Sequence, residues 1–192
     1  MFTNNYIAYR HNFFFSMFST GTSGGVTGKK VKDATGASFS MYSQSSGRGS
    51  DIGCCMATAN CQAIPTSKES SESSVDYGVY FGAGSTPATR DDYTLESPIT
   101  SGLSISTTNK VISNDGNGKY TVSAFYVVKN TTSEDLNIYE MGCFTPIMKA
   151  SSEYYAVMMD RTVLSEPITI KAGETKVVTY SIVFNHILNV EA

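Results

Sequence analysis

The chain has 192 residues and a mass of 20.7 kDa, which suffices for one core, or one core and an arm, but not for a large multidomain enzyme. It contains 26 Ser, 21 Thr, 16 Gly and 11 Asn residues, and this wealth of small polar residues favours strands and turns over a helical bundle. The formal net charge is −3, so the chain lacks the broad basic surface of nucleic-acid-binding proteins, and we expect no direct contact with nucleic acid.

Residues 1–25 are predicted to form an N-terminal arm with a hinge. Aromatic and apolar residues recur at spacings of three and four, as on one side of a helix: Phe2, Tyr6, Tyr9, Phe13 and Met17. The Gly, Ser and Thr residues of 19–25 interrupt this pattern and indicate a flexible hinge. Two interpretations stay open, because the stripe can pack on the chain's own core or dock on a neighbouring subunit. The second predicts an assembly interface made by Phe2, Tyr6, Phe13, Phe14 and Phe15.

Neither a membrane span nor a secretory signal is expected. The longest apolar clusters, 13–15 and 156–159, are far shorter than the roughly 20 residues that cross a bilayer. The N-terminus lacks a cationic region that leads into a continuous apolar segment. We therefore expect no membrane partner and synthesis in a cytoplasm.

Residues 26–74 are predicted to be a β-rich N-terminal segment that ends in a polar linker, 66–74. Three of the four cysteines, Cys54, Cys55 and Cys61, fall here, and Cys143 is distant. This spacing does not match a zinc site, so no metal is predicted. Small buried side chains and a disulfide to Cys143 both remain open interpretations.

Residues 75–192 are predicted to form an antiparallel β-sandwich of about seven strands, with short connections. Residues 119–129 alternate with a period of two, and the turn 115–118 should pair them with 103–113 as a hairpin. The turn 171–174 is expected to join 167–170 to the final strand, 178–184, as another hairpin. Strands are also expected at 136–144 and 154–159. With the N-terminal segment the whole chain is all-β, a jelly-roll or Ig-like sandwich of about seven to eight strands with an N-terminal arm.

No catalytic residue and no cofactor are predicted, and the chain is interpreted as a non-enzyme. Its two histidines, His11 and His186, lie near the chain ends and beside no recognisable nucleophile. Asp91 and Asp92 are adjacent, so in a strand they would point to opposite faces, and turn capping is the favoured interpretation. The Gly-Ala-Gly run at 82–84 lacks the lysine of a phosphate-binding loop.

Three stretches resemble a family of small structural proteins from the virions of tailed bacteriophages. Residues 77–99 contain a strand, a Gly-x-Gly turn and a Thr/Pro loop that leads into Asp-Tyr-x-Leu-Glu. Residues 125–142 are similar to the family's strand, its Asn-rich turn and its Ile-x-Val-x-Glu-x-Gly segment. Residues 159–182 resemble its Arg-x-Val-Leu segment, turn and closing strand. The resemblance covers about 75–186 and extends more faintly to 31–43; the chain departs from it at Cys54, Cys55 and Cys61, and at 100–102, where many relatives carry His-Gly.

The resemblance implies a β-sandwich building block of a phage particle, present in many copies at the head, collar or tail. Its expected partners are copies of itself and other virion proteins, and its expected location is the virion after synthesis in the host bacterial cytoplasm. The alternative is a receptor-binding or carbohydrate-binding module on the virion surface, because Tyr-rich and Asn-rich loops can present aromatic platforms to a host-surface glycan. The absence of tryptophan weighs against this alternative.

Overall fold

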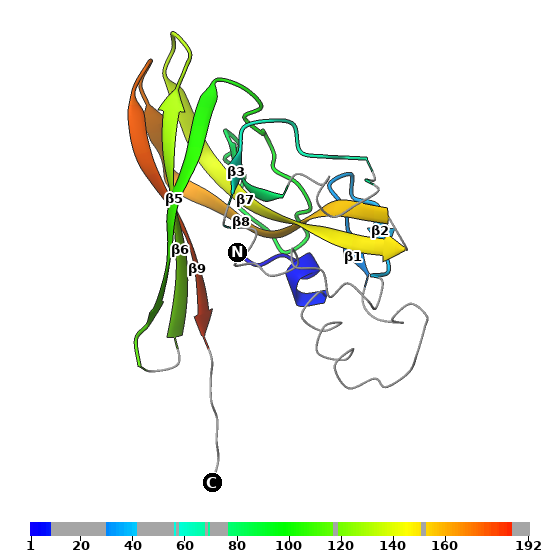
Figure 1. Cartoon of the computed structure of the whole chain (residues 1–192). Helices are drawn as coiled ribbons and strands as arrows, with labels where there is room; N and C mark the ends of the chain where they lie inside the picture. Colours follow the sequence, from blue (N-terminus) through cyan, green and yellow to red (C-terminus); the bar gives the residue numbers. More distant parts are fainter. Residues whose placement is uncertain are drawn as a thin grey trace.

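The computed structural model is mostly β-structure, as Figure 1 shows, so the prediction of an all-β chain is confirmed. It describes residues 1–8, 30–41, 56, 58–67, 69, 77–116, 119–150 and 153–185. Residues 4–8 form a short helical segment. Nine strands follow in chain order: β1 (Val31–Lys32), β2 (Ser38–Phe39), β3 (Ala59–Asn60), β4 (Gly78–Gly82), β5 (Leu103–Asn114), β6 (Lys119–Asn130), β7 (Leu136–Ala150), β8 (Glu153–Ile170) and β9 (Thr175–Asn185).

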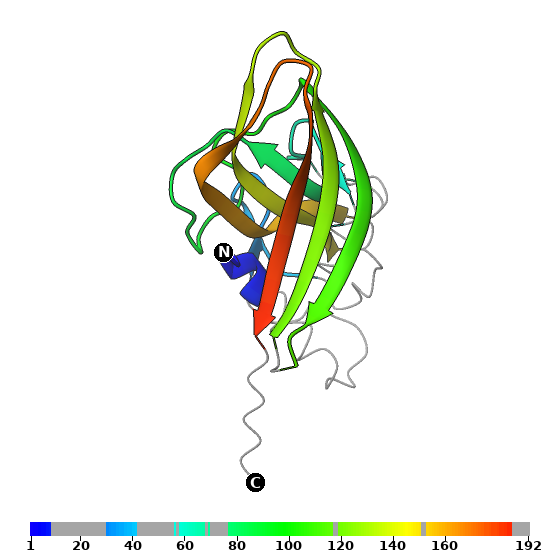
Figure 2. The same cartoon turned by 90° about the vertical axis from the view of Figure 1, so that its left-hand side faces the viewer.

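The strands form three sheets. One has four strands in the order β3-β4-β7-β8, another has three in the order β5-β6-β9, and β1 pairs with β2. All pairs are antiparallel except β3 with β4. Figure 2 shows the three-stranded sheet from its outer side, with β5 and β9 at its two edges.

The predicted hairpin of 103–113 with 119–129 is confirmed. β5 and β6 pair from Leu103↔Asn130 to Asn114↔Tyr120, with a register shift at Thr107/Asn109. β6 also pairs with β9 over eleven consecutive residues without a shift. Alternation places one side of each strand on the core, because successive side chains in a strand point to opposite faces. The inward side includes Ala124, Tyr126, Val128, Val178, Tyr180 and Ile182, all buried.

Two sequence predictions about β8 were wrong. Residues 154–159 and 167–170 belong to one 18-residue strand, because β7 is long enough to pair with both parts. The ladder passes from Ile138↔Ile168 to Glu140↔Val163, and the extra residues that bulge out of β8 there include Pro167, which cannot donate a ladder hydrogen bond. The turn 171–174 does exist, but it joins β8 to β9 of the other sheet and so makes no hairpin.

Side chains from the four-stranded and three-stranded sheets share one core cluster. From the first come Val79, Phe81, Ile138, Met141, Cys143, Val157 and Met159, and from the second the inward residues of β6 and β9. The N-terminal residues Tyr6, Ala8, Val31, Phe39, Met41 and Met56 join the same cluster. These six residues therefore pack with the larger sheets in one core, whereas Ala34 and Ile64 belong to a second, smaller cluster.

Candidate functional site

A buried arginine in β8 gathers three carboxylates beside the loop 83–98. Arg161 is 3% exposed; its Nε donates to Glu140 Oε2 at 2.9 Å, and its Nη1 donates to Asp92 Oδ2 at 2.8 Å. Its Nη2 lies 3.7 Å from Glu96 Oε2. Arg161 pairs across the ladder with Gly142 of β7. We call Asp92, Glu96, Glu140 and Arg161 the Arg161 cluster.

Glu140 connects the cluster to the backbone of the loop. The residue is fully buried, and its Oε1 accepts hydrogen bonds from the N–H groups of Gly84 at 3.2 Å and Ser97 at 2.8 Å. Its Oε2 accepts from the N–H of Glu96 at 3.2 Å as well as from Arg161. A carboxylate is tolerated in a protein interior when it is paired and hydrogen-bonded. Through these bonds the Glu140 side chain holds both ends of the loop 83–98 against β7.

Three glycines make room for this arrangement. A Cβ on Gly84 would lie 2.6 Å from Glu140 Oε1, and a Cβ on Gly82 would overlap the same carboxylate. A Cβ on Gly142 would lie 2.8 Å from Leu95 Cδ2. The Gly-x-Gly turn therefore serves the close approach of a carboxylate, in place of the phosphate that a glycine-rich loop can cradle.

Threonines hold the remaining carboxylates in turns. The N–H and Oγ1 of Thr86 donate to Glu96 at 2.8 and 2.6 Å, and those of Thr89 donate to Asp92 at 2.9 and 2.7 Å. Asp91 instead accepts a hydrogen bond from Asn4 Nδ2 at 2.8 Å. The prediction that the Asp91-Asp92 pair serves turn structure is confirmed for Asp92, and the two carboxylates engage different partners.

These contacts set the protonation of the cluster. Burial raises the pKa of Asp92, but hydrogen bonds from Arg161 and Thr89 outweigh this effect, so the pKa lies below its usual value. Hydrogen bonds from Thr86 lower the pKa of Glu96. Burial lowers the pKa of Arg161, but its bonds to Asp92 and Glu140 outweigh burial and leave the pKa raised. Asp92, Glu96 and Arg161 are therefore held ionised at neutral pH.

The members of the Arg161 cluster come from three separate stretches of the sequence. Asp92 and Glu96 come from the Asp-Tyr-x-Leu-Glu segment, Glu140 from the Glu-x-Gly segment and Arg161 from the Arg-x-Val-Leu segment. That these residues meet was not predicted from the sequence. The available signal was a charged residue within or directly after an apolar strand, namely Glu140 in 136–144 and Arg161 after 156–159.

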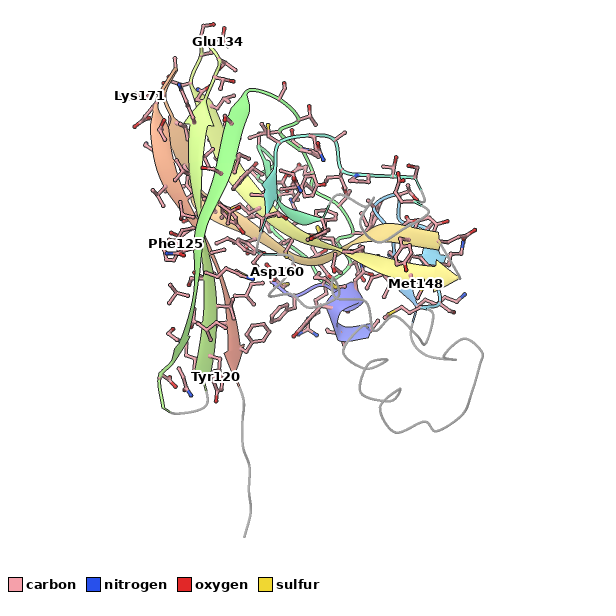
Figure 3. The ribbon with its side chains drawn as sticks, viewed as in Figure 1. Tyr120, Phe125, Glu134, Met148, Asp160 and Lys171 are labelled. Carbon is pink, nitrogen blue, oxygen red and sulfur yellow. The ribbon has the colours of Figure 1, made fainter. Side chains whose placement is uncertain are left out.

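A second buried polar contact lies between the two larger sheets, where Figure 3 labels Asp160. The hydroxyl of Tyr180, on β9, donates to Asp160 Oδ2 at 2.5 Å. The ammonium group of Met1 lies 3.1 Å from Asp160 Oδ1. The pKa of Tyr180 is raised well above its usual value, mainly by burial and also by the nearby charge of Asp160. This contact joins strands β8 and β9 across the core.

Two of the predicted assembly residues pack within the chain itself. The Phe2 ring stacks on Tyr6 at 4.1 Å between centroids and lies 5.7 Å from Phe184. Tyr6 is 9% exposed and belongs to the core cluster, and Phe2 forms a bridge with Asp160 of β8. For these two residues the structure favours the intramolecular interpretation, because β8 offers an unpaired edge on which residues 1–3 lie. The predicted assembly residues Phe13, Phe14 and Phe15 lie outside the described residues.

The two described cysteines, Cys61 and Cys143, are not joined to each other by a disulfide. Cys143 is buried in the core and Cys61 is partly buried; Cys54 and Cys55 fall outside the described residues. Within the described ranges, no cluster of His, Cys, Asp and Glu side chains is arranged to hold a metal ion. The same ranges contain no helix with the length and hydropathy needed to cross a membrane.

Comparisons with known proteins found no match for this chain. No protein-family model, no curated protein and no solved structure matches it.

Proposed function

We propose that this chain is a non-enzymatic structural component of a bacteriophage particle, which assembles in multiple copies with other virion proteins at the head, collar or tail. One observation carries the proposal: the charged residues of three separate stretches that resemble this family meet in the buried Arg161 cluster. If the residues of the three stretches act together in one contact that closes the fold, this would explain why the stretches occur in the same order as in that family. This meeting of the three stretches supports an architectural basis for the resemblance.

We extend the proposal to the fold, as a β-sandwich of the jelly-roll or Ig-like kind with an N-terminal arm. The β3-β4-β7-β8 and β5-β6-β9 sheets would be its two layers. Support comes from the core cluster, to which both sheets contribute, and from the contact of Tyr180 with Asp160 between them. Seven strands make up these two sheets, and six of them, β4 to β9, lie within 75–192.

The chemistry of the Arg161 cluster supports a role in stability. Its arginine binds two carboxylates directly, and Glu140 binds the backbone of the loop at three points. These interactions fix the loop 83–98 against β7 and keep it in one conformation. A fixed surface loop suits a subunit that must present the same contacts in every copy of an assembly.

The experiment is to locate the protein in purified particles. Particles produced by cells that carry the gene would be banded by density and analysed by quantitative mass spectrometry, and the protein would be placed by immunogold labelling. We expect several copies per particle at one fixed position. Absence from the particles, with the protein recovered only from the soluble cell fraction, would refute the proposal. Glycan-array binding by the full-length protein, competed by free sugar, would instead support the receptor-binding alternative.

A further inference from the structure

Strand β9 presents a long, regular edge. It pairs with β6 from Lys119↔Asn185 to Lys129↔Thr175 without a bulge, and no described strand pairs with its other side. Unpaired strand edges offer rows of N–H and C=O groups to another strand, so proteins usually protect them. An eleven-residue edge of this kind is long enough for a stable pairing with a second strand.

The other sheet edges in the described ranges carry such protection. β5 has a register shift at Thr107/Asn109, which twists the edge away from flat pairing. β8 is bridged at Asp160 by Phe2 and at Tyr154 by Glu69, and its remaining part contains Pro167. β3 is only two residues long. The β9 edge therefore stands apart from the others.

The side chains of β9 fit a second copy of the same strand. On its outer face the two strongly exposed apolar residues are Val177, 63% exposed, and Val183, 41% exposed. They lie three positions to either side of Tyr180. Antiparallel pairing places residues of the same face opposite each other, so a two-fold axis through Tyr180 puts each Val177 opposite Val183 of the other copy. Thr179 then faces Ser181 of the other copy.

This register brings no like charges together. The one charged residue of β9 is Lys176, whose Nζ donates to the carbonyl of Thr169 and lies 3.6 Å from a carboxylate oxygen of Glu174. In the two-fold register Lys176 lies opposite Phe184 of the other copy, and the two lysines are roughly 27 Å apart along the strands, at about 3.4 Å per residue. Neither charge repulsion nor a buried unpaired charge opposes the pairing.

We propose that β9 is the interface between two copies of this chain, which pair antiparallel about a two-fold axis at Tyr180 and join their three-stranded sheets into one. The inference deepens the multi-copy part of the proposed function and rests on it. The outer face of the joined sheet would then carry Val177 and Val183 of both copies side by side, shielding each other from water.

The experiment measures self-association of the full-length chain and of charge variants by sedimentation equilibrium over about 1–100 μM. In Val177→Lys/Val183→Lys, each lysine faces another lysine across the two-fold axis, and we expect dimer dissociation constants at least about tenfold weaker than those of the wild type. In Val177→Lys/Val183→Glu, each lysine faces a glutamate, and we expect association close to that of the wild type. Val111→Lys places the same charge on the outer face at the opposite edge, and we expect no change.

Three outcomes would overturn the inference: a wild-type chain that stays monomeric across this range, a Lys/Lys variant that associates normally, or a Lys/Glu variant that is as weak as Lys/Lys. Circular dichroism of each variant shows that it is folded, and the Lys/Glu variant shows that substitution at these two sites does not by itself prevent association. Particle incorporation separates this result from the proposed function. A monomeric protein found in particles would refute the β9 interface alone, and a β9 dimer absent from particles would refute the virion role alone.

Discussion

Replacing Glu140 with glutamine should destabilise the protein strongly, although it changes only one atom of the side chain. The carboxylate accepts bonds from three backbone N–H groups and from Arg161 while fully buried. The amide of Glu140→Gln would keep one acceptor oxygen and turn its NH2 group toward N–H donors. It would also leave the charge of Arg161 paired only with the carboxylates of the loop.

The expected magnitude follows from these losses. Removing one partner of a buried ion pair costs about 3–5 kcal/mol, and Asp92 still pairs with Arg161, so we expect about 3 kcal/mol of lost unfolding free energy. For a chain of this size this corresponds to a melting temperature lower by roughly 6–12 °C. The measurement is urea unfolding followed by circular dichroism, with thermal melts in parallel.

A matched control and a double variant test the reasoning. Glu166→Gln removes a carboxylate from an exposed position of β8 and should cost less than about 0.5 kcal/mol. In Glu140→Gln/Arg161→Met the loss should be at least about 1 kcal/mol smaller than the sum of the single losses, since each single change already removes the contact between Glu140 and Arg161. A loss below about 1 kcal/mol for Glu140→Gln, or strictly additive losses, would show that the pair does not stabilise the loop.

Three further predictions concern pH and close packing. The pKa of Asp92 is depressed in the folded state, so its ionised form stabilises the protein above the ordinary pKa of the residue. This stability is lost as the pH falls through the pKa of the folded state. In urea titrations Asp92→Asn should therefore be less stable than the wild type at pH 7, and the difference should disappear in acid. Because its pKa is raised, Tyr180 keeps its proton in the folded state at a pH where the unfolded chain ionises, so stability should fall above about pH 10. In thermal melts at alkaline pH, the melting temperature of Tyr180→Phe should fall less steeply with pH than that of the wild type. Gly84→Ala should cost about 1–3 kcal/mol in urea unfolding because its Cβ meets a carboxylate, whereas Gly116→Ala, at φ 79° with open space around it, should cost only about 1 kcal/mol of backbone strain; equal losses would contradict this reasoning.

The sequence was sufficient for the local β-structure. A period of two in 119–129 predicted both β6 and the face it buries, and the Asp-Gly-Asn-Gly turn predicted its pairing with β5. Both signals act between neighbouring residues: alternation follows from the pleat, and glycine at a turn supplies backbone conformations that other residues avoid. The same alternation predicts burial of Tyr126, Tyr180, Ile182 and Phe184; the first three are buried, whereas Phe184 near the end of β9 is only partly buried.

The sequence did not determine which sheet each strand joins. The turn 171–174 has the composition of a hairpin turn, yet β8 and β9 separate into different sheets because β7 pairs with β8 along almost its whole length. The aromatic spacing of residues 1–18 likewise left two interpretations open. Packing resolved them for Phe2 and Tyr6, since the free edge of β8 and the ring of Phe184 lie close enough to receive them.

The Arg161 cluster depended most on tertiary structure. Its members come from 92, 96, 140 and 161, and each is unremarkable as a single charged residue in a sequence. Only the register Gly82↔Glu140 and Gly142↔Arg161 places the Glu140 side chain against a glycine and brings Arg161 within hydrogen-bond distance of it. Local propensity thus determined the strands and their buried faces, whereas the pairing of distant strands decided which charges meet. The reason is that electrostatic contacts depend on distance in space and leave no periodic pattern along the chain.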